Sequence, residues 1–160
     1  MDYTIVALIS YLFGSIPFGF LLSKVFLNID IRKIGSGNIG ATNVLRTGNK
    51  FLAILTLVLD FLKGYVTIFI TLKYFNDLIL LSALICLLGH IFSIWLKFKG
   101  GKGVATYLGI LLALSVNYFL IFIIVWVSIL LIFKYSSLSS ILATFGIFIY
   151  EYFFLENNIF

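Results

Sequence analysis

Two short glycine-rich stretches interrupt a chain that is otherwise almost continuously apolar. The first runs from Gly35 to Arg46 (GSGNIGATNVLR) and the second from Lys97 to Thr106 (KFKGGKGVAT). Both combine glycine and small polar side chains with fixed positive charge. A membrane protein tolerates irregular backbone with free amides only where water or a polar ligand satisfies them. The two stretches therefore predict a polar site at a membrane boundary, and their composition indicates a phosphate-bearing ligand.

The first stretch has the composition of a phosphate-binding backbone loop. Gly35, Gly37 and Gly40 allow positive φ and close backbone approach, so successive amides can point into one concavity. Arg46 follows, and its planar guanidinium suits two phosphoryl oxygens. Uncharged hydrogen-bonding side chains accompany them at Ser36, Asn38, Thr42 and Asn43. The alternative is a flexible loop whose basic residues contact anionic lipid.

The second stretch resembles a phosphate-binding loop at the entry to a helix. Lys99, Gly100, Gly101 and Lys102 come just before Val104, where the apolar pattern resumes. No Ser or Thr follows the second lysine and the upstream glycine spacing is wrong for a Walker A loop, so ATP hydrolysis is unsupported. Alone, this stretch fits a basic interfacial turn equally well. Its pairing with the first stretch makes it informative.

The elements that must position these stretches are transmembrane helices. Of the 160 residues, 62% are hydrophobic and 11% charged, and no segment alternates with the period of a barrel strand. We expect an all-α polytopic membrane bundle in a single domain, residues 1–160. The first segment carries Pro17, lacks a basic leader and is too long for a signal peptide, so it is read as a retained helix. The six expected segments are 3–26, 51–75, 78–96, 104–116, 118–133 and 138–155.

The positive charges predict the orientation of these helices. Nine of the eleven Lys and Arg residues fall in alternate connections, at Lys24, Arg32, Lys33, Arg46, Lys50, Lys97, Lys99, Lys102 and Lys134. The positive-inside rule places that side in the cytoplasm. The N-terminus is then outside, and both glycine-rich stretches face the cytoplasm.

Two charged residues lie within the second apolar segment. An unpaired charge there would cost about 2.5–3.5 kcal/mol on insertion scales. Asp60 and Lys63 are three residues apart, so they can meet on one helix face. A purely structural ion pair and a role in orienting the polar site both remain open.

Three other polar residues have a bland and a functional interpretation. His90 ends the third segment, where a structural hydrogen bond is favoured over a general base. Ser140, near the start of the last segment, can donate to a phosphate, although helix capping explains most hydroxyls there. The lone Cys86 is expected to be a packing residue. No Ser-His-Asp set or metal-ligand cluster is visible, so neither cofactor nor metal is expected.

The chain closely resembles the PlsY family, the bacterial acyl-phosphate:glycerol-3-phosphate acyltransferases. The resemblance extends from the first helix to about Ser140. Order, spacing and membrane context all match. The matching motifs are Gly35–Asn38 (GSGN), Gly40–Arg46 (GATNVLR), Asp60–Gly64 (DFLKG), Gly89–His90 and Phe98–Thr106 (FKGGKGVAT).

The resemblance implies transfer of a fatty acyl group from acyl phosphate to the 1-hydroxyl of glycerol 3-phosphate, giving lysophosphatidic acid at the inner membrane. Ser36, Arg46, Lys102 and Ser140 align with family positions that bind the phosphorylated substrates, and we assign the first three as catalytic. The substrate-binding candidates are Gly37, Asn38, Gly40, Thr42, Asn43, His90, Lys99, Gly100, Gly101 and Ser140. Membrane lipids, and an enzyme that forms acyl phosphate or one that acylates the product, are the expected partners, with no nucleic acid.

The chain departs from the family pattern in two respects. Ile39 and Ser93 stand where many relatives have proline. Relatives also continue through a seventh helix to a motif of the form His-Arg-x-Asn-Ile-x-Arg-Leu, and Asn157-Asn158-Ile159 does not correspond to it. The alternative function is therefore a catalytically incomplete membrane protein that binds or transports phosphate or anionic lipid.

Overall fold

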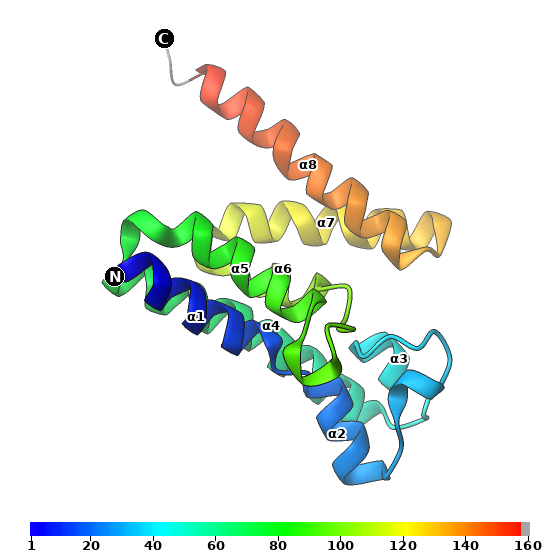
Figure 1. The fold of residues 1–160 in the computed structure, drawn as a ribbon. Helices are drawn as coiled ribbons and strands as arrows, with labels where there is room; N and C mark the ends of the chain where they lie inside the picture. The colour runs from blue at the N-terminus through cyan, green and yellow to red at the C-terminus, as the bar shows by residue number, and fades with distance from the viewer. Residues whose placement is uncertain (158–160) are drawn as a thin grey trace. The chain divides into compact units, whose positions relative to one another are not determined.

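The computed structural model describes residues 1–157, and this part of the chain is all-α, as predicted (Figure 1). It divides into an N-terminal unit, Met1–Ala113, and a C-terminal unit from Leu114 onward. Most of the Asn157-Asn158-Ile159 segment lies outside the described residues. The helices are α1 (Asp2–Ser15), α2 (Phe18–Leu27), α3 (Ala41–Leu45), α4 (Lys50–Tyr74), α5 (Ile79–Ile91), α6 (Val104–Leu114), α7 (Val116–Phe133) and α8 (Ser136–Asn157), with short 3₁₀ turns η1 (Ile31–Lys33), η2 (Asn76–Leu78) and η3 (Ile94–Leu96).

The first apolar segment is two helices rather than the one helix expected over 3–26. α1 ends at Ser15 and α2 begins at Phe18. Pro17 has no amide hydrogen and restricts the residue before it, and Ile16 accordingly leaves helical geometry with φ −59° and ψ 116°. The sequence identified the proline, but the expectation of a continuous helix was wrong.

Four stretches of residues 1–157 are long and apolar enough to cross a membrane: Asp2–Leu27, Lys50–Tyr74, Asn76–Leu96 and Val116–Phe133. α6 is apolar but shorter. Each of the six predicted segments corresponds to helical structure, whereas the number of crossings stays a prediction.

Glycines allow the helices of the N-terminal unit to pack closely. α1, α4 and α5 contact one another, and α6 lies against α4 (Figure 1). A Cβ on Gly14 would collide with the Cys86 carbonyl of α5, and one on Gly64 would collide with the Thr106 carbonyl of α6. Cys86 is fully buried, which agrees with a packing role. Small residues at these crossings let the backbones approach, as is usual in membrane bundles.

The C-terminal unit is a pair of helices, α7 and α8, packed against each other. Lys134, in the left-handed region at φ 59°, ends α7 and reverses the chain. The Tyr118 hydroxyl donates to the Glu151 carboxylate, and the Trp126 Nε1 donates to the Ser140 Oγ over 3.1 Å. Side-chain hydrogen bonds therefore tie the two helices together at two levels.

Replacing Gly14 by alanine is expected to destabilise the N-terminal unit. The added methyl group must push α5 away from α1, which typically costs about 1–3 kcal/mol in a well-packed interior. Gly146→Ala in α8 is the matched control, because its Cβ would meet only side-chain atoms at 3.4 Å and beyond. We expect a lower thermal midpoint in detergent for Gly14→Ala only; equal midpoints would contradict the close packing.

Candidate active site

Asn43 organises the first glycine-rich loop, which connects α2 to α4. Its side chain is buried, and its Nδ2 lies 3.0 Å from the Ile31 carbonyl, 3.0 Å from that of Ile34 and 2.8 Å from that of Asn38. Its Oδ1 accepts from the Ser36 amide at 3.1 Å. One side chain therefore replaces the regular hydrogen bonding that this irregular backbone lacks. Asn43 was predicted as a substrate contact, and the structure gives its side chain an internal role.

The loop is held against the helices by a small apolar core. Ile39 is 1% exposed and belongs to this core, so the residue at the position of the family's proline is used for packing. Leu96 from η3, just before the second loop, belongs to the same core. The two loops are thus built on one set of packed side chains: Ile31, Ile39, Val44, Leu52, Ala53 and Leu96.

The cations of the first loop differ in availability. Arg32 forms a bidentate pair with Asp30, and its guanidinium lowers the pKa of that exposed carboxyl to about 2, so its charge is already partnered near neutral pH. Arg46 is exposed and lies beside Gly35, where a Cβ would come within 2.7 Å of its guanidinium. Gly35 also has φ +54°, so both space and backbone favour glycine there. Arg46 is therefore the better-placed arginine for an incoming anion.

The second loop folds back onto the end of α5. The Gly100 amide donates to the Ile91 carbonyl at 2.9 Å, and the Gly101 amide donates to the His90 carbonyl at 3.1 Å. These two predicted ligand-binding amides are thus engaged by the chain itself. Over residues 1–157, no such backbone bond involves the amides of Lys102, Gly103 and Val104, which lead into α6. Free amides at a helix start favour an anion, so this end of the loop is the better candidate.

His90 is a buried contact between the second loop and α6. Its Nδ1 lies 3.2 Å from the Thr106 Oγ1, and the opposite ring nitrogen faces Gly101 so closely that a Cβ there would collide with it. The residue is 4% exposed. This environment is that of a structural hydrogen bond, the interpretation favoured from the sequence over a general base.

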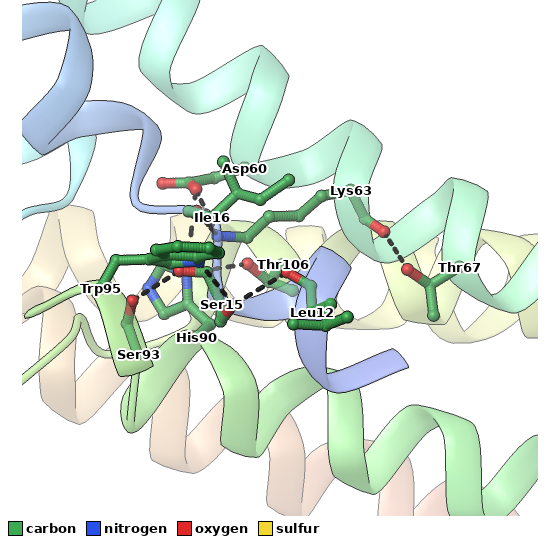
Figure 2. Close-up of polar contacts among 10 residues, drawn as sticks. All are labelled: Leu12, Ser15, Ile16, Asp60, Lys63, Thr67, His90, Ser93, Trp95 and Thr106. Atoms are coloured by element: carbon green, nitrogen blue, oxygen red, sulfur yellow. Dashed lines mark hydrogen bonds and ion pairs between the residues drawn. The ribbon is translucent and has the colours of Figure 1, made fainter. Parts of the chain in front are cut away.

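A polar cluster lies beneath the second loop, at the break between α1 and α2 (Figure 2). Lys63 Nζ is 2.8 Å from Asp60 Oδ1 and donates to the Ile16 carbonyl at 2.7 Å. The Asp60 contact lacks hydrogen-bond geometry, so it is an ion pair in character. Asp60 Oδ1 is also 3.8 Å from the His90 Nδ1. The ion pair expected from the i,i+3 spacing is confirmed, and it reaches beyond its own helix.

Sequence reasoning did not identify the residues that complete this cluster. The Ser93 Oγ donates to the Ser15 carbonyl at 2.6 Å, and the Trp95 Nε1 donates to the Ser15 Oγ at 2.9 Å (Figure 2). Pro17 was the available signal, because a proline break leaves carbonyls at the end of a helix without amide partners. Which side chains would satisfy them depends on tertiary contacts more than 70 residues away.

The remaining predicted residues are placed as follows. Ser36, Gly37, Thr42, Lys99 and Lys102 are exposed, whereas Asn38, Gly40, Gly100 and Gly101 are half-buried. Ser140 belongs to the C-terminal unit, where its Oγ donates to the Ser136 carbonyl and accepts from Trp126. It stays a predicted substrate contact. Among the described residues, no three His, Cys, Asp or Glu side chains gather as a metal site would need.

Asn43→Ala is expected to loosen the first loop. It leaves buried carbonyls and the Ser36 amide without their partner, at about 1–3 kcal/mol for each group that water cannot reach. Thr42→Ala is the control, because that neighbouring side chain is exposed. Limited proteolysis should cut the Asn43→Ala loop faster than the parent's and leave Thr42→Ala unchanged. Similar cleavage of both variants would show that Asn43 does not hold the loop.

Comparison with known proteins agrees with this site. A sequence model described as glycerol-3-phosphate acyltransferase matches residues 4–160. The glycerol-3-phosphate acyltransferase of Pelagibacter ubique (strain HTCC1062) is 58% identical over 144 residues, which cover 90% of this chain and 75% of the relative. That of Wolbachia pipientis wMel is 49% identical over 160 residues, covering 98% and 83%.

Two solved structures share the fold. Both are of PlsY (YgiH), an integral membrane glycerol 3-phosphate acyltransferase, one in a glycerol 3-phosphate form and one in a lysophosphatidic acid form. Their TM-scores are 0.88 and 0.86 at 39% identity, and the matches cover 95% of this chain and 77% and 76% of those chains. The chain therefore belongs to the glycerol-3-phosphate acyltransferase family of integral membrane enzymes.

Proposed function

We propose that this protein transfers a fatty acyl group from acyl phosphate to the 1-hydroxyl of glycerol 3-phosphate, forming lysophosphatidic acid for phospholipid synthesis. The observation that carries the proposal is the pair of glycine-rich loops, which share one apolar core and present exposed Arg46 and Lys102. Family membership supports it, since solved relatives were captured in glycerol 3-phosphate and lysophosphatidic acid forms.

The proposed reaction needs no nucleophile from the protein. The glycerol 3-phosphate hydroxyl oxygen attacks the acyl carbonyl carbon, the bond from that carbon to the phosphate oxygen breaks, and inorganic phosphate leaves. The hydroxyl proton passes to a phosphate oxygen. A mixed anhydride already carries a good leaving group, so orienting the substrates and neutralising the departing charge supply most of the acceleration.

Each candidate residue has a role in this scheme that its geometry allows. Arg46 and Lys102 bind phosphoryl oxygens and stabilise the leaving phosphate. The Ser36 amide is held by Asn43, which leaves the exposed Ser36 hydroxyl to contact substrate. Lys99 adds to the positive potential. The polar groups assigned to substrate positioning are Gly37, Asn38, Gly40, Thr42, the loop backbone at Gly100 and Gly101, and Ser140.

The chemistry also implies a location and neighbours. Positive charge on alternate connections supports a multi-pass protein of the cytoplasmic membrane, with the N-terminus outside and both loops facing the cytoplasm. Residues 1–160 act as one membrane domain in this proposal. An enzyme must supply the acyl phosphate, and another must consume lysophosphatidic acid.

Purified protein in detergent or lipid, given palmitoyl phosphate and radiolabelled glycerol 3-phosphate, should form lysophosphatidic acid. Arg46→Ala and Lys102→Ala should each lower kcat/KM by about 100-fold or more, since each removes charge aimed at the departing phosphate. Lys73→Ala, at the far end of α4, is the control and should retain the parent rate. Folded parent protein that binds glycerol 3-phosphate without making product would instead support the phosphate-binding alternative.

A second kinetic test uses the collision between Gly101 and His90. Gly101→Ala should lower kcat/KM about tenfold or more because the new methyl group displaces the loop from the imidazole. In His90→Ala that ring is absent, so adding Gly101→Ala should cost little further activity.

Gly100→Ala is the matched control for this pair. Its Cβ would collide with the His90 backbone carbonyl, which His90→Ala retains, so its loss should persist in the double variant. Independent, multiplying losses for His90→Ala and Gly101→Ala would contradict the proposed contact.

A further inference from the structure

Asp60 and Lys63 are more deeply buried than an ordinary salt bridge. Their side chains are 3% and 2% exposed, within an apolar membrane-spanning helix. A buried pair is weak support for stability by itself, because removing two charges from water offsets much of their attraction. A purely structural pair would also need no partners beyond itself. The contacts of this pair are wider than that.

The contacts of the pair converge on the backbone segments that shape the site. Lys63 Nζ satisfies the Ile16 carbonyl at the break of the first span. Asp60 Oδ1 lies 3.8 Å from His90, which ends α5, and His90 is hydrogen-bonded to Thr106 at the start of α6. Figure 2 shows these side chains converging from four elements on one point.

That point is adjacent to the second glycine-rich loop. The loop begins after η3, where Ser93 is bonded to the α1 break, and it ends at α6, where Thr106 is bonded to His90. Between these two points the Gly101 amide donates to the His90 carbonyl. α4 itself contacts the loop's exit closely, since Gly64 has no space for a Cβ beside the Thr106 carbonyl. Both ends of the loop are therefore anchored on groups that contact Asp60 and Lys63 or their direct partners.

We propose that Asp60 and Lys63 are positioning residues for acyl transfer: they fix the α1 break, the end of α5 and the start of α6 relative to one another, and thereby set the position of Lys102. The inference rests on the proposed function, because its readout is the transfer reaction. Neither residue contacts substrate. Lys63 acts through its bond to the Ile16 carbonyl, and Asp60 holds the Lys63 ammonium and faces His90.

The test separates positioning from charge balance. Lys63→Met and Asp60→Asn each leave one buried charge unpaired, so both should lower the thermal midpoint and the activity. The double variant Asp60→Asn/Lys63→Met has no buried charge, so its midpoint should return toward the parent's. Its Ile16 carbonyl still lacks a donor, so we expect kcat/KM for glycerol 3-phosphate to stay about tenfold or more below the parent's, chiefly through a higher KM.

Thr67→Val is the matched control. Thr67 is buried one turn along the same helix, and its hydroxyl donates to the Lys63 carbonyl without contacting either loop. It should keep activity within about twofold of the parent, because only a local helix bond is lost.

The outcomes are distinguishable. Parent-like activity in the double variant would overturn the inference and leave a structural ion pair. Parent protein without any transferase activity would instead refute the proposed function. Should the double variant remain unstable, combining Lys63→Met with Thr106→Val decides, at a temperature where each variant is folded. Losses smaller than the product of the single losses support a shared route to the loop, and fully multiplying losses overturn it.

Discussion

The break in the first membrane span is the constraint on which the rest of the structure depends. Pro17 ends α1 at Ser15, and this leaves the Ser15 and Ile16 carbonyls within an apolar segment. Backbone polar groups at such a depth must find internal partners. The partners are Ser93, from the segment after α5, and Lys63, from α4. A local defect in one helix thus fixes three segments that are distant in the sequence.

The polar site is assembled around this break. Leu96, three residues after Ser93, belongs to the apolar core beneath the first loop, so the two loops are positioned by the same packed side chains. Within the first loop, Asn43 takes the hydrogen bonds that regular structure would otherwise provide. Irregular backbone of this kind is stable in a membrane protein because its carbonyls and amides are satisfied internally, except where a ligand can approach.

This economy suits a reaction whose substrates bring their own reactivity. An acyl phosphate needs no activation by a protein nucleophile, and the chain's contribution is a rigid arrangement of cations and amides beside the reacting groups. Buried polar residues such as His90 and Asn43 then serve the shape of the site, while exposed Arg46 and Lys102 remain available to substrate phosphate. Rigidity and reactivity are divided between different residues.

The sequence by itself determined the all-α membrane class, the helical segments, both glycine-rich loops and the family, because hydrophobic length and motif spacing are local properties of the chain. It also identified the Asp60–Lys63 pair, whose partners are one helical turn apart. Only the tertiary structure decided that the first span is broken, that Asn43, Gly100 and Gly101 direct hydrogen-bonding groups into the chain, and that Lys63 reaches Ile16. Those outcomes depend on which distant groups meet, and local pattern carries no information about that.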